Sequence, residues 1–290
     1  MDVAELTWVS ALVGIGLLTG VTTVLFGFGG GFVAVPVVVW ADAALGGDAM
    51  RVATATSALV MVVNAGFATA VTPRRVLVGL RDSRALLLLL AVGAVVGALA
   101  TRLVPGAVVR WAFVGYVALT VVDLLLRPGF LRPRAPSQAS DDASGDVPGD
   151  APVSVPGDNP RPLPALLGAP VGAVAAFLGV GGSVMTVPAL RRAGHTMHVA
   201  TALANPLTLV IALPAAAVSL GGAGLATAPD AHLLGLVDPV AAAALLLGAL
   251  PVIAVLRRRP PRIPDRIHAW TYIGLLAVVA VAMLLSGGQA

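Results

Sequence analysis

Long apolar runs separated by short polar stretches dominate the chain. A helix needs about 20 apolar residues to span a bilayer, so the pattern predicts eight hydrophobic segments. They are Leu6–Trp40, Val52–Val71, Ala85–Val104, Val108–Leu126, Leu163–Leu190, Val199–Leu220, Leu233–Leu256 and Ile267–Leu285. The chain is therefore predicted to be an all-α integral membrane protein.

Two of these segments are interrupted by glycine-rich stretches that read GFGGGFVAVP at 27–36 and GVGGSVMTVP at 179–188. Each glycine weakens a helix by about 1 kcal/mol relative to alanine. Irregular backbone at membrane depth persists only where it is buried in protein or lines a wet cavity. The half-helix after such a break presents unpaired N–H groups and the positive end of its dipole, which favour anions.

The two halves of the chain are related to each other. The two glycine stretches are identical at five of ten positions, and Met50–Ala55 matches Met197–Ala202 at five of six. Internal duplication is common in secondary transporters. We therefore predict two homologous four-segment repeats, residues 1–126 and 163–290, each opening with a glycine-broken or re-entrant helix.

A polar stretch at residues 127–162 separates the halves. It is rich in Pro, Asp, Ser and Gly and poor in large apolar residues. Such a composition cannot bury a core, so this stretch is predicted to be a disordered cytoplasmic linker.

Composition agrees with a multi-pass protein in the plasma (inner) membrane. Only 11% of residues are charged, and the mean hydropathy is +0.96, whereas a soluble domain carries about 25% charged residues. All 18 basic residues are arginines in predicted loops, so the high pI does not indicate nucleic-acid binding. There is no cysteine, and the four histidines lie near predicted helix ends without metal-ligand spacing. We expect interfacial histidines and no metal or other cofactor.

Arginines also bear on topology. If all eight segments cross the membrane, the two sides carry 8 and 10 arginines, which favours no orientation. If the glycine-broken segments are re-entrant hairpins, the counts become 3 and 15, with both termini outside. The alternative to the hairpins is eight spans with two broken helices, because the 21 residues before the first break could span alone.

A glycine-rich break followed by proline in both halves resembles the TauE/SafE sulfite exporter family, also called the toluene sulfonate uptake permease family. The resemblance covers both halves but not the linker. It implies proton-coupled or facilitated transport of sulfur-containing anions such as sulfite or organosulfonates. The second half departs slightly, with Ser183 where the first half has Gly31, which adds a hydroxyl donor.

The breaks and the polar residues near them form the predicted substrate site. Hydroxyl and amide donors can hold sulfonate oxygens without a buried charge. The expected residues are Gly29, Gly30, Gly31, Thr54, Ser57, Gly181, Gly182, Ser183, Thr201 and Asn205; Asn64 lies on the same segment as Thr54. The alternatives are that the hydroxyls bond within their own helices and that the glycines serve close helix packing, as at Gly16/Gly20 and Gly93/Gly97.

The sequence therefore predicts a permease for small anions that works by alternating access at a midplane site. The competing functions are an anion channel and a transporter of a non-sulfur carboxylate. We expect no enzymatic activity, because no intramembrane Asp, Glu or His grouping is present. The lipid bilayer is the expected partner, and assembly as a homodimer is left open.

Overall fold

The computed structural model describes residues 3–77, 80, 83–127, 130, 164–221, 233–258 and 263–286, and the side chains of residues 3–6, 75 and 76 are not described. Every element that these residues form is a helix. The α-helices are α1 (Val3–Phe26), α2 (Gly31–Ala41), α3 (Ala49–Ala70), α4 (Arg74–Leu77), α5 (Arg84–Leu103), α6 (Gly106–Leu126), α7 (Gly168–Leu178), α8 (Ser183–Arg192), α9 (Met197–Leu220), α10 (Pro239–Arg258) and α11 (Asp265–Leu285), with 3-10 turns at Ala43–Asp48 and Ala165–Leu167.

Seven helices in the described part of the chain are long and apolar enough to cross a membrane, whereas the sequence predicted eight hydrophobic segments. They are α1, α3, α5, α6, α9, α10 and α11. The fifth predicted segment instead forms two short helices, α7 and α8, of 11 and 10 residues. At 1.5 Å per residue, neither can cross a hydrocarbon core of about 30 Å.

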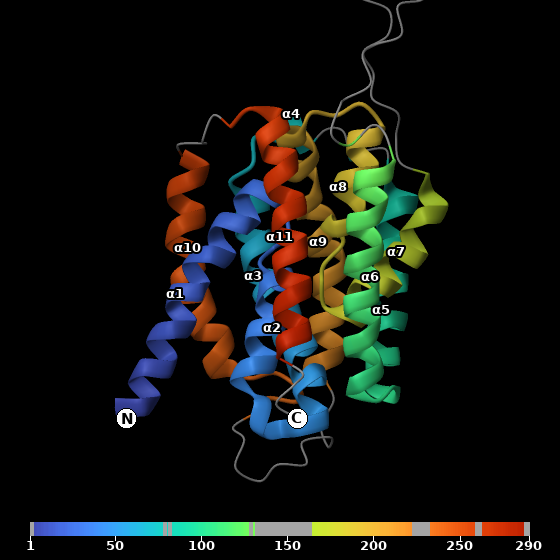
Figure 1. The fold of residues 1–290 in the computed structure, drawn as a ribbon. Helices are drawn as coiled ribbons and strands as arrows, with labels where there is room; N and C mark the ends of the chain where they lie inside the picture. The colour runs from blue at the N-terminus through green and yellow to red at the C-terminus, as the bar shows by residue number, and fades with distance from the viewer. Residues whose placement is uncertain are drawn as a thin grey trace, which may run out of the picture.

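Each glycine-broken segment begins and ends on one side of the bundle, and the two segments use opposite sides (Figure 1). The α1–α2 segment starts and finishes at the end where α11 terminates, and α7–α8 starts and finishes at the opposite end. Contacts agree, because Trp40 near the end of α2 shares a groove with Leu285 of α11. Since α1 is long enough to span alone, the first segment combines a long arm with a short return helix.

Glycines allow two helix pairs to pack closely, α1 against α10 and α5 against α7. A Cβ on Gly16 would lie 2.4 Å from the Leu245 carbonyl oxygen, and one on Gly93 would lie 2.1 Å from the Ala169 carbonyl oxygen. No side chain fits at such distances. At these positions the glycines therefore serve helix packing, the role that their spacing allowed.

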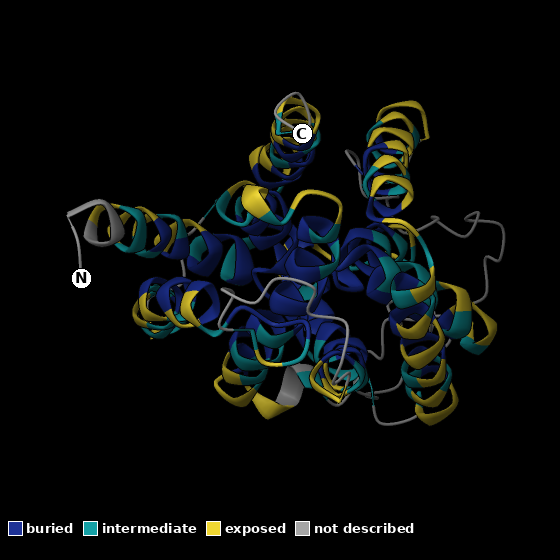
Figure 2. Cartoon of the chain, turned by 90° about the horizontal axis from the view of Figure 1, so that it is seen from below, coloured by how far each residue is buried: buried dark blue, intermediate teal, exposed yellow. Residues whose placement is uncertain are grey.

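Helices α3 and α9 cross in the middle of the bundle, and each packs against the short helix of its own half, α2 or α8. Figure 2 shows the buried residues gathered in this middle and the exposed residues on the outward faces of the peripheral helices. The exposed side chains there include large apolar ones such as Leu88, Leu119 and Leu247. An apolar exterior around a buried centre is the arrangement that a bilayer solvent favours.

Of the predicted linker, only Arg127 and Phe130 lie among the described residues. Phe130 is fully buried, with its ring 5.4 Å from that of Tyr272. The rest of the linker prediction falls outside the described residues.

Candidate functional site

Both breaks are sharp turns in which glycines adopt left-handed backbone conformations. In the first break, φ is +74° at Gly27, +62° at Gly29 and +83° at Gly30; in the second, it is +68° at Gly179 and +69° at Gly181. Residues other than glycine rarely adopt such angles. The glycine clusters therefore form these turns because of their backbone conformation.

The two breaks meet in the centre of the molecule. A Cβ on Gly29 and one on Gly181 would each lie 3.0 Å from the same Thr208 methyl group on α9. Both breaks also contact Met61 on α3, whose Sδ lies 2.4 Å from a Cβ position on Gly31 and 2.8 Å from one on Gly181. Met61 is buried and fills the space between the breaks.

Each break also packs closely against a long helix of the other half, the first break against α9 and the second against α3. A Cβ on Gly27 would lie 2.6 Å from the carbonyl oxygen of Thr201 on α9. On the other side, Gly179 packs against Thr54 and Ser57 of α3, and Ser57 donates a hydrogen bond to the Gly179 carbonyl oxygen at 3.0 Å. The two halves therefore hold each other's turns in place.

The helices that follow the breaks start without a side-chain cap. Neither Gly30 before α2 nor Gly182 before α8 carries a capping hydrogen bond from its own side chain, and glycine offers none. The first N–H groups of a helix have no partner within the helix, and its N-terminus carries about half a positive charge. Both ends are buried, and glycines at the start of α2 and just before the start of α8, Gly31 and Gly181, lie against Met61.

Several buried polar side chains on α3, α8 and α9 lack hydrogen-bond partners among the described residues. Asn64 of α3 is 0% exposed and neither of its amide atoms is bonded, although its nitrogen lies 2.7 Å from the Cβ position of Gly30. The Ser183 and Thr186 hydroxyls of α8 and the Asn205 amide oxygen of α9 are likewise unpaired. An unpaired buried polar group costs about 1–3 kcal/mol, so each of these groups requires an explanation such as a bound water or polar ligand.

The other predicted side chains are already hydrogen-bonded. Thr54 donates to the Met50 carbonyl, Ser57 to the Thr54 and Gly179 carbonyls, and Thr201 to the His198 carbonyl. Their protons are therefore occupied within this conformation, as the alternative interpretation of Ser and Thr in helices expects. All ten predicted residues are buried.

Sequence reasoning missed Met61, Thr186 and Thr208, and it noted Asn64 without including it in the site. A signal was present, because the alignment of Met50 with Met197 places Met61 opposite Thr208 and Asn64 opposite Ile211. These are the residues on which the two breaks rest.

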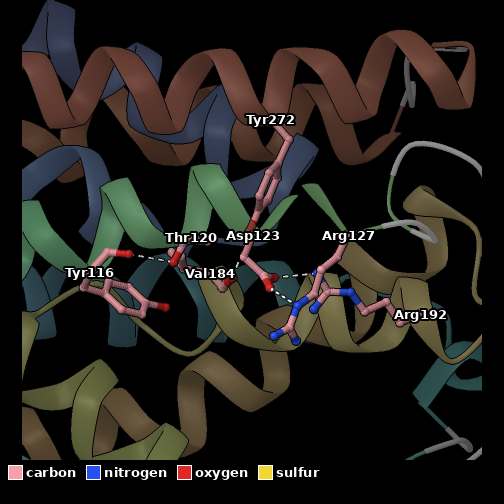
Figure 3. Close-up of polar contacts among 7 residues, drawn as sticks. All are labelled: Tyr116, Thr120, Asp123, Arg127, Val184, Arg192 and Tyr272. Carbon is pink, nitrogen blue, oxygen red and sulfur yellow. Dashed lines mark hydrogen bonds and ion pairs between the residues drawn. The ribbon is translucent and has the colours of Figure 1, made fainter. Parts of the chain in front are cut away.

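Side chains of α6 and α11 hold α8 at both of its ends (Figure 3). At the start, the Tyr272 hydroxyl donates to the Ser183 carbonyl oxygen at 3.2 Å. At the end, Arg192 pairs with Asp123 of α6 at 2.5 Å. The neighbouring Arg191 is completely buried, with Nη1 2.8 Å from Asp265 Oδ2 in an ionic contact and Nη2 donating to a backbone carbonyl.

The end of α2 lies instead beside a pair of carboxylates. Asp238 caps α10 by accepting the N–H groups of Val240 and Ala241, and it is the acidic neighbour of Asp42. Burial, followed by the charge of Asp238, raises the pKa of Asp42 to about 7. The buried Asp42 Oδ2 has no donor in this structure, so a hydrogen bond between the two carboxylates requires that one of them be protonated.

One histidine departs from its prediction as an interfacial side chain. His268 is buried, and its Nε2 lies 2.5 Å from the Leu25 carbonyl oxygen at the end of α1. A helix end leaves carbonyl groups without partners, and the histidine satisfies one of them. His232 lies outside the described residues.

Comparison with known protein families adds the functional context of this geometry. The family model described as sulfite exporter TauE/SafE matches residues 12–283, which is nearly the whole chain. The chain belongs to the sulfite exporter TauE/SafE family. Neither a curated protein nor a solved structure gives a significant match.

Membership of the TauE/SafE family confirms the resemblance that the glycine–proline pattern indicated. The family is one of membrane transporters rather than of enzymes, and the long apolar helices agree with a multi-pass membrane protein. The matched region includes both breaks and all ten predicted site residues.

Proposed function

We propose that this TauE/SafE chain is a secondary transporter that carries small sulfur-containing anions across the plasma membrane by alternating access. The substrate site is the place where the two glycine breaks meet. The observation that carries the proposal is Asn64, whose amide is fully buried and unpaired beside the start of α2.

The chemistry of the site favours an anion over a cation. Two uncapped helix N-termini direct positive potential toward the space around Met61. Amide N–H groups and hydroxyls are donors that suit the oxygens of sulfite or a sulfonate. No acidic side chain lies on α2, α3, α8 or α9 to attract a cation.

The filling of the space favours a carrier over an open channel. Met61 occupies the gap between Gly31 and Gly181, so an anion can reach both helix N-termini only after this side chain moves. Methionine is unbranched and flexible, which suits such a rearrangement.

The packing pattern supports two repeats of opposite orientation. Shifting residue numbers by 152 takes Gly16 to Gly168, and shifting them by 155 takes Gly93 to Gly248. All four glycines lie in the two matched pairs, α1 with α10 and α5 with α7, where a side chain would meet a backbone carbonyl. Inverted repeats around a central site are a recurrent transporter design.

The distribution of arginines supports an orientation. The start of α3, the end of α5 and the start of α6 lie at the end of the bundle where α1 begins (Figure 1), and they carry Arg51, Arg102 and Arg110. The elements and helix ends that carry the other described arginines lie at the opposite end. The positive-inside rule then places the termini outside and the 127–162 linker in the cytoplasm. Ser140→Cys in this cysteine-free chain should resist an impermeant thiol reagent in intact cells; ready labelling would reverse the orientation.

The decisive experiment is uptake of labelled sulfite and methanesulfonate into proteoliposomes, with and without a pH gradient to test proton coupling. Gly30→Leu should abolish uptake, because φ is +83° there and a side chain would strike Asn64. Gly115→Leu is the matched control, because a Cβ at that exposed glycine meets nothing within 4 Å. Wild-type liposomes that take up none of a panel of sulfur anions would overturn the proposal.

A further inference from the structure

The elements that meet at the site carry no charge near it. Helix α2 has no ionisable residue, and those of α3, α8 and α9 lie at the helix ends, at Arg51, Arg191, Arg192 and His198. Arg51 comes ten residues before Met61, which is about 15 Å along a helix. It also pairs with Asp48 and with a backbone carbonyl.

The nearest cation on the second break is also remote and engaged. Arg191 follows Gly182 by nine residues, about 13 Å along α8, and its guanidinium is committed to Asp265. The His268 imidazole, buried beside the end of α1, is engaged with the Leu25 carbonyl oxygen. The charge that can compensate a bound anion therefore comes from the two helix N-termini. Each contributes about half an elementary charge, so together they supply about one.

Side chains at the site add hydrogen bonds but no further charge. The unpaired groups of Asn64 and Ser183 are neutral. Any negative charge beyond the first would be buried without compensation, and an uncompensated charge in a low-dielectric interior is strongly unfavourable. A hydroxyl can also accept a hydrogen bond, so these groups can pair with the proton of a monoprotonated oxyanion.

We infer that the site selects monoanions and rejects dianions, so that organosulfonates and hydrogen sulfite are bound in preference to sulfate and the sulfite dianion. This inference rests on the proposed function, since it specifies the substrate class of the same site. The inference follows from the number of charges at the site, whereas the proposed function follows from the buried and unpaired amide of Asn64.

The test is thermal stabilisation of the purified protein by methanesulfonate and by sulfate at matched ionic strength, because a ligand that binds only the folded state raises its stability. Methanesulfonate should raise the unfolding temperature saturably, with an affinity at least about tenfold greater than that of sulfate, which corresponds to about 1.4 kcal/mol. Sulfate binding as tightly as methanesulfonate would overturn the inference and leave the proposed function standing. Failure of every anion would overturn both.

Sulfite provides an internal comparison, because it exchanges between monoanion and dianion near neutral pH. Its apparent affinity should increase as the pH is lowered through that exchange, whereas methanesulfonate keeps one charge throughout and corrects for titration of the protein. Equal pH dependence for the two ligands would count against selection by charge.

A charge placed at the second break should change the preference. Ile211→Lys puts a cation beside Gly182, because the Ile211 Cδ1 atom lies only 2.5 Å from the position that a Cβ on Gly182 would occupy. Sulfate affinity should then rise relative to methanesulfonate by at least about tenfold. Ile211→Met is the uncharged control of similar length. An unchanged preference in a folded Ile211→Lys protein would contradict the inference; if that variant does not fold, the wild-type comparisons decide it.

Discussion

The two glycine breaks share part of their backbone course but differ at the residue before the following helix. Gly30 precedes α2 with a φ of +83°, whereas Gly182 precedes α8 with a φ of −74°, which any residue can adopt. The next position is Gly31 in the first break and Ser183 in the second. The first break therefore depends on glycine more strongly.

The side chains that face the breaks differ in polarity. Asn64 lies against Gly30 and Ile211 lies against Gly182, although the two occupy equivalent positions in the aligned halves. Burial alone favours an apolar residue, and Ile211 fits that expectation. An unpaired asparagine at the matching position costs stability, which indicates that the two breaks have diverged in chemistry while keeping their architecture.

The far ends of the two short helices differ as well. Helix α8 ends at ion pairs with Asp265 and Asp123, whereas α2 ends beside two carboxylates, Asp42 and Asp238. The α8 end is held by attraction between opposite charges, and the α2 end depends on protonation.

The largest effect is expected where α8 ends. Asp265→Asn removes the charge that compensates Arg191, whose side chain is fully buried. The free energy of unfolding should fall by about 3 kcal/mol, at the low end for a broken buried pair because the Asp265 side chain is itself 37% exposed and asparagine keeps its hydrogen-bonding oxygen. Chemical denaturation of the purified protein measures it.

The matched control for that change is Asp123→Asn. Its partner Arg192 is partly exposed and its partner Arg127 is largely exposed, so the loss should stay below about 1 kcal/mol. Equal losses for the two variants would show that burial of Arg191 does not govern the stability of this end.

The next effect concerns the residues that face the breaks. Ile211→Ala removes buried apolar volume and should cost about 2–4 kcal/mol. Asn64→Ala removes two unpaired polar atoms, so its cost should be close to zero or the protein should gain stability. The anion-induced rise in unfolding temperature should disappear in Asn64→Ala and persist in Ile211→Ala. Loss of stability in Asn64→Ala with an intact anion response would assign this amide a structural role.

A smaller effect is expected at the glycines that precede the short helices. Gly30→Ala forces alanine into a left-handed conformation with its Cβ 2.7 Å from the Asn64 amide nitrogen, at a cost of about 1–3 kcal/mol. Gly182→Ala keeps an ordinary φ and meets only the terminal methyl of Ile211, which can turn away. Comparison of their unfolding temperatures tests the asymmetry, and equal losses would contradict it.

Features that depend on local sequence could be predicted, whereas features that depend on contacts between distant segments could not. The breaks were predictable because a cluster of glycines directly weakens the helix that an apolar segment would otherwise form, and the packing role of Gly93 followed from its spacing. The burial of Arg191 was not predicted, because its partner Asp265 is 74 residues away in sequence. Met61 was not predicted either, since a methionine in an apolar helix carries no local signal of what it separates.

The number of spans shows the same limit. Hydropathy marked Leu163–Leu190 as one glycine-interrupted segment and left open whether it crosses or re-enters, because an apolar pair of short helices has the composition of one long helix. Only the turn at Gly179 and Gly181 and the return of α8 distinguish the two. That information lies in tertiary packing against α3, where Ser57 bonds to the turn.

The smallest effect concerns pH and the end of α2. Because burial and Asp238 raise the pKa of Asp42 from 3.8 to about 7, the folded protein holds a proton there that the unfolded chain releases. The resulting stabilisation is fully present below pH 3.8 and is lost as the pH rises through about 7. Wild type should therefore unfold at a lower temperature at about pH 8.5 than at about pH 5.5 through this group. In Asp42→Asn, which is neutral at every pH, this decline should be reduced.

Amide exchange at the end of α2, where the Asp42 N–H bonds to the Val38 carbonyl, should accelerate with pH beyond the intrinsic rate in wild type alone. The same pH dependence in both proteins would show that the carboxylate pair does not hold this end of the first hairpin.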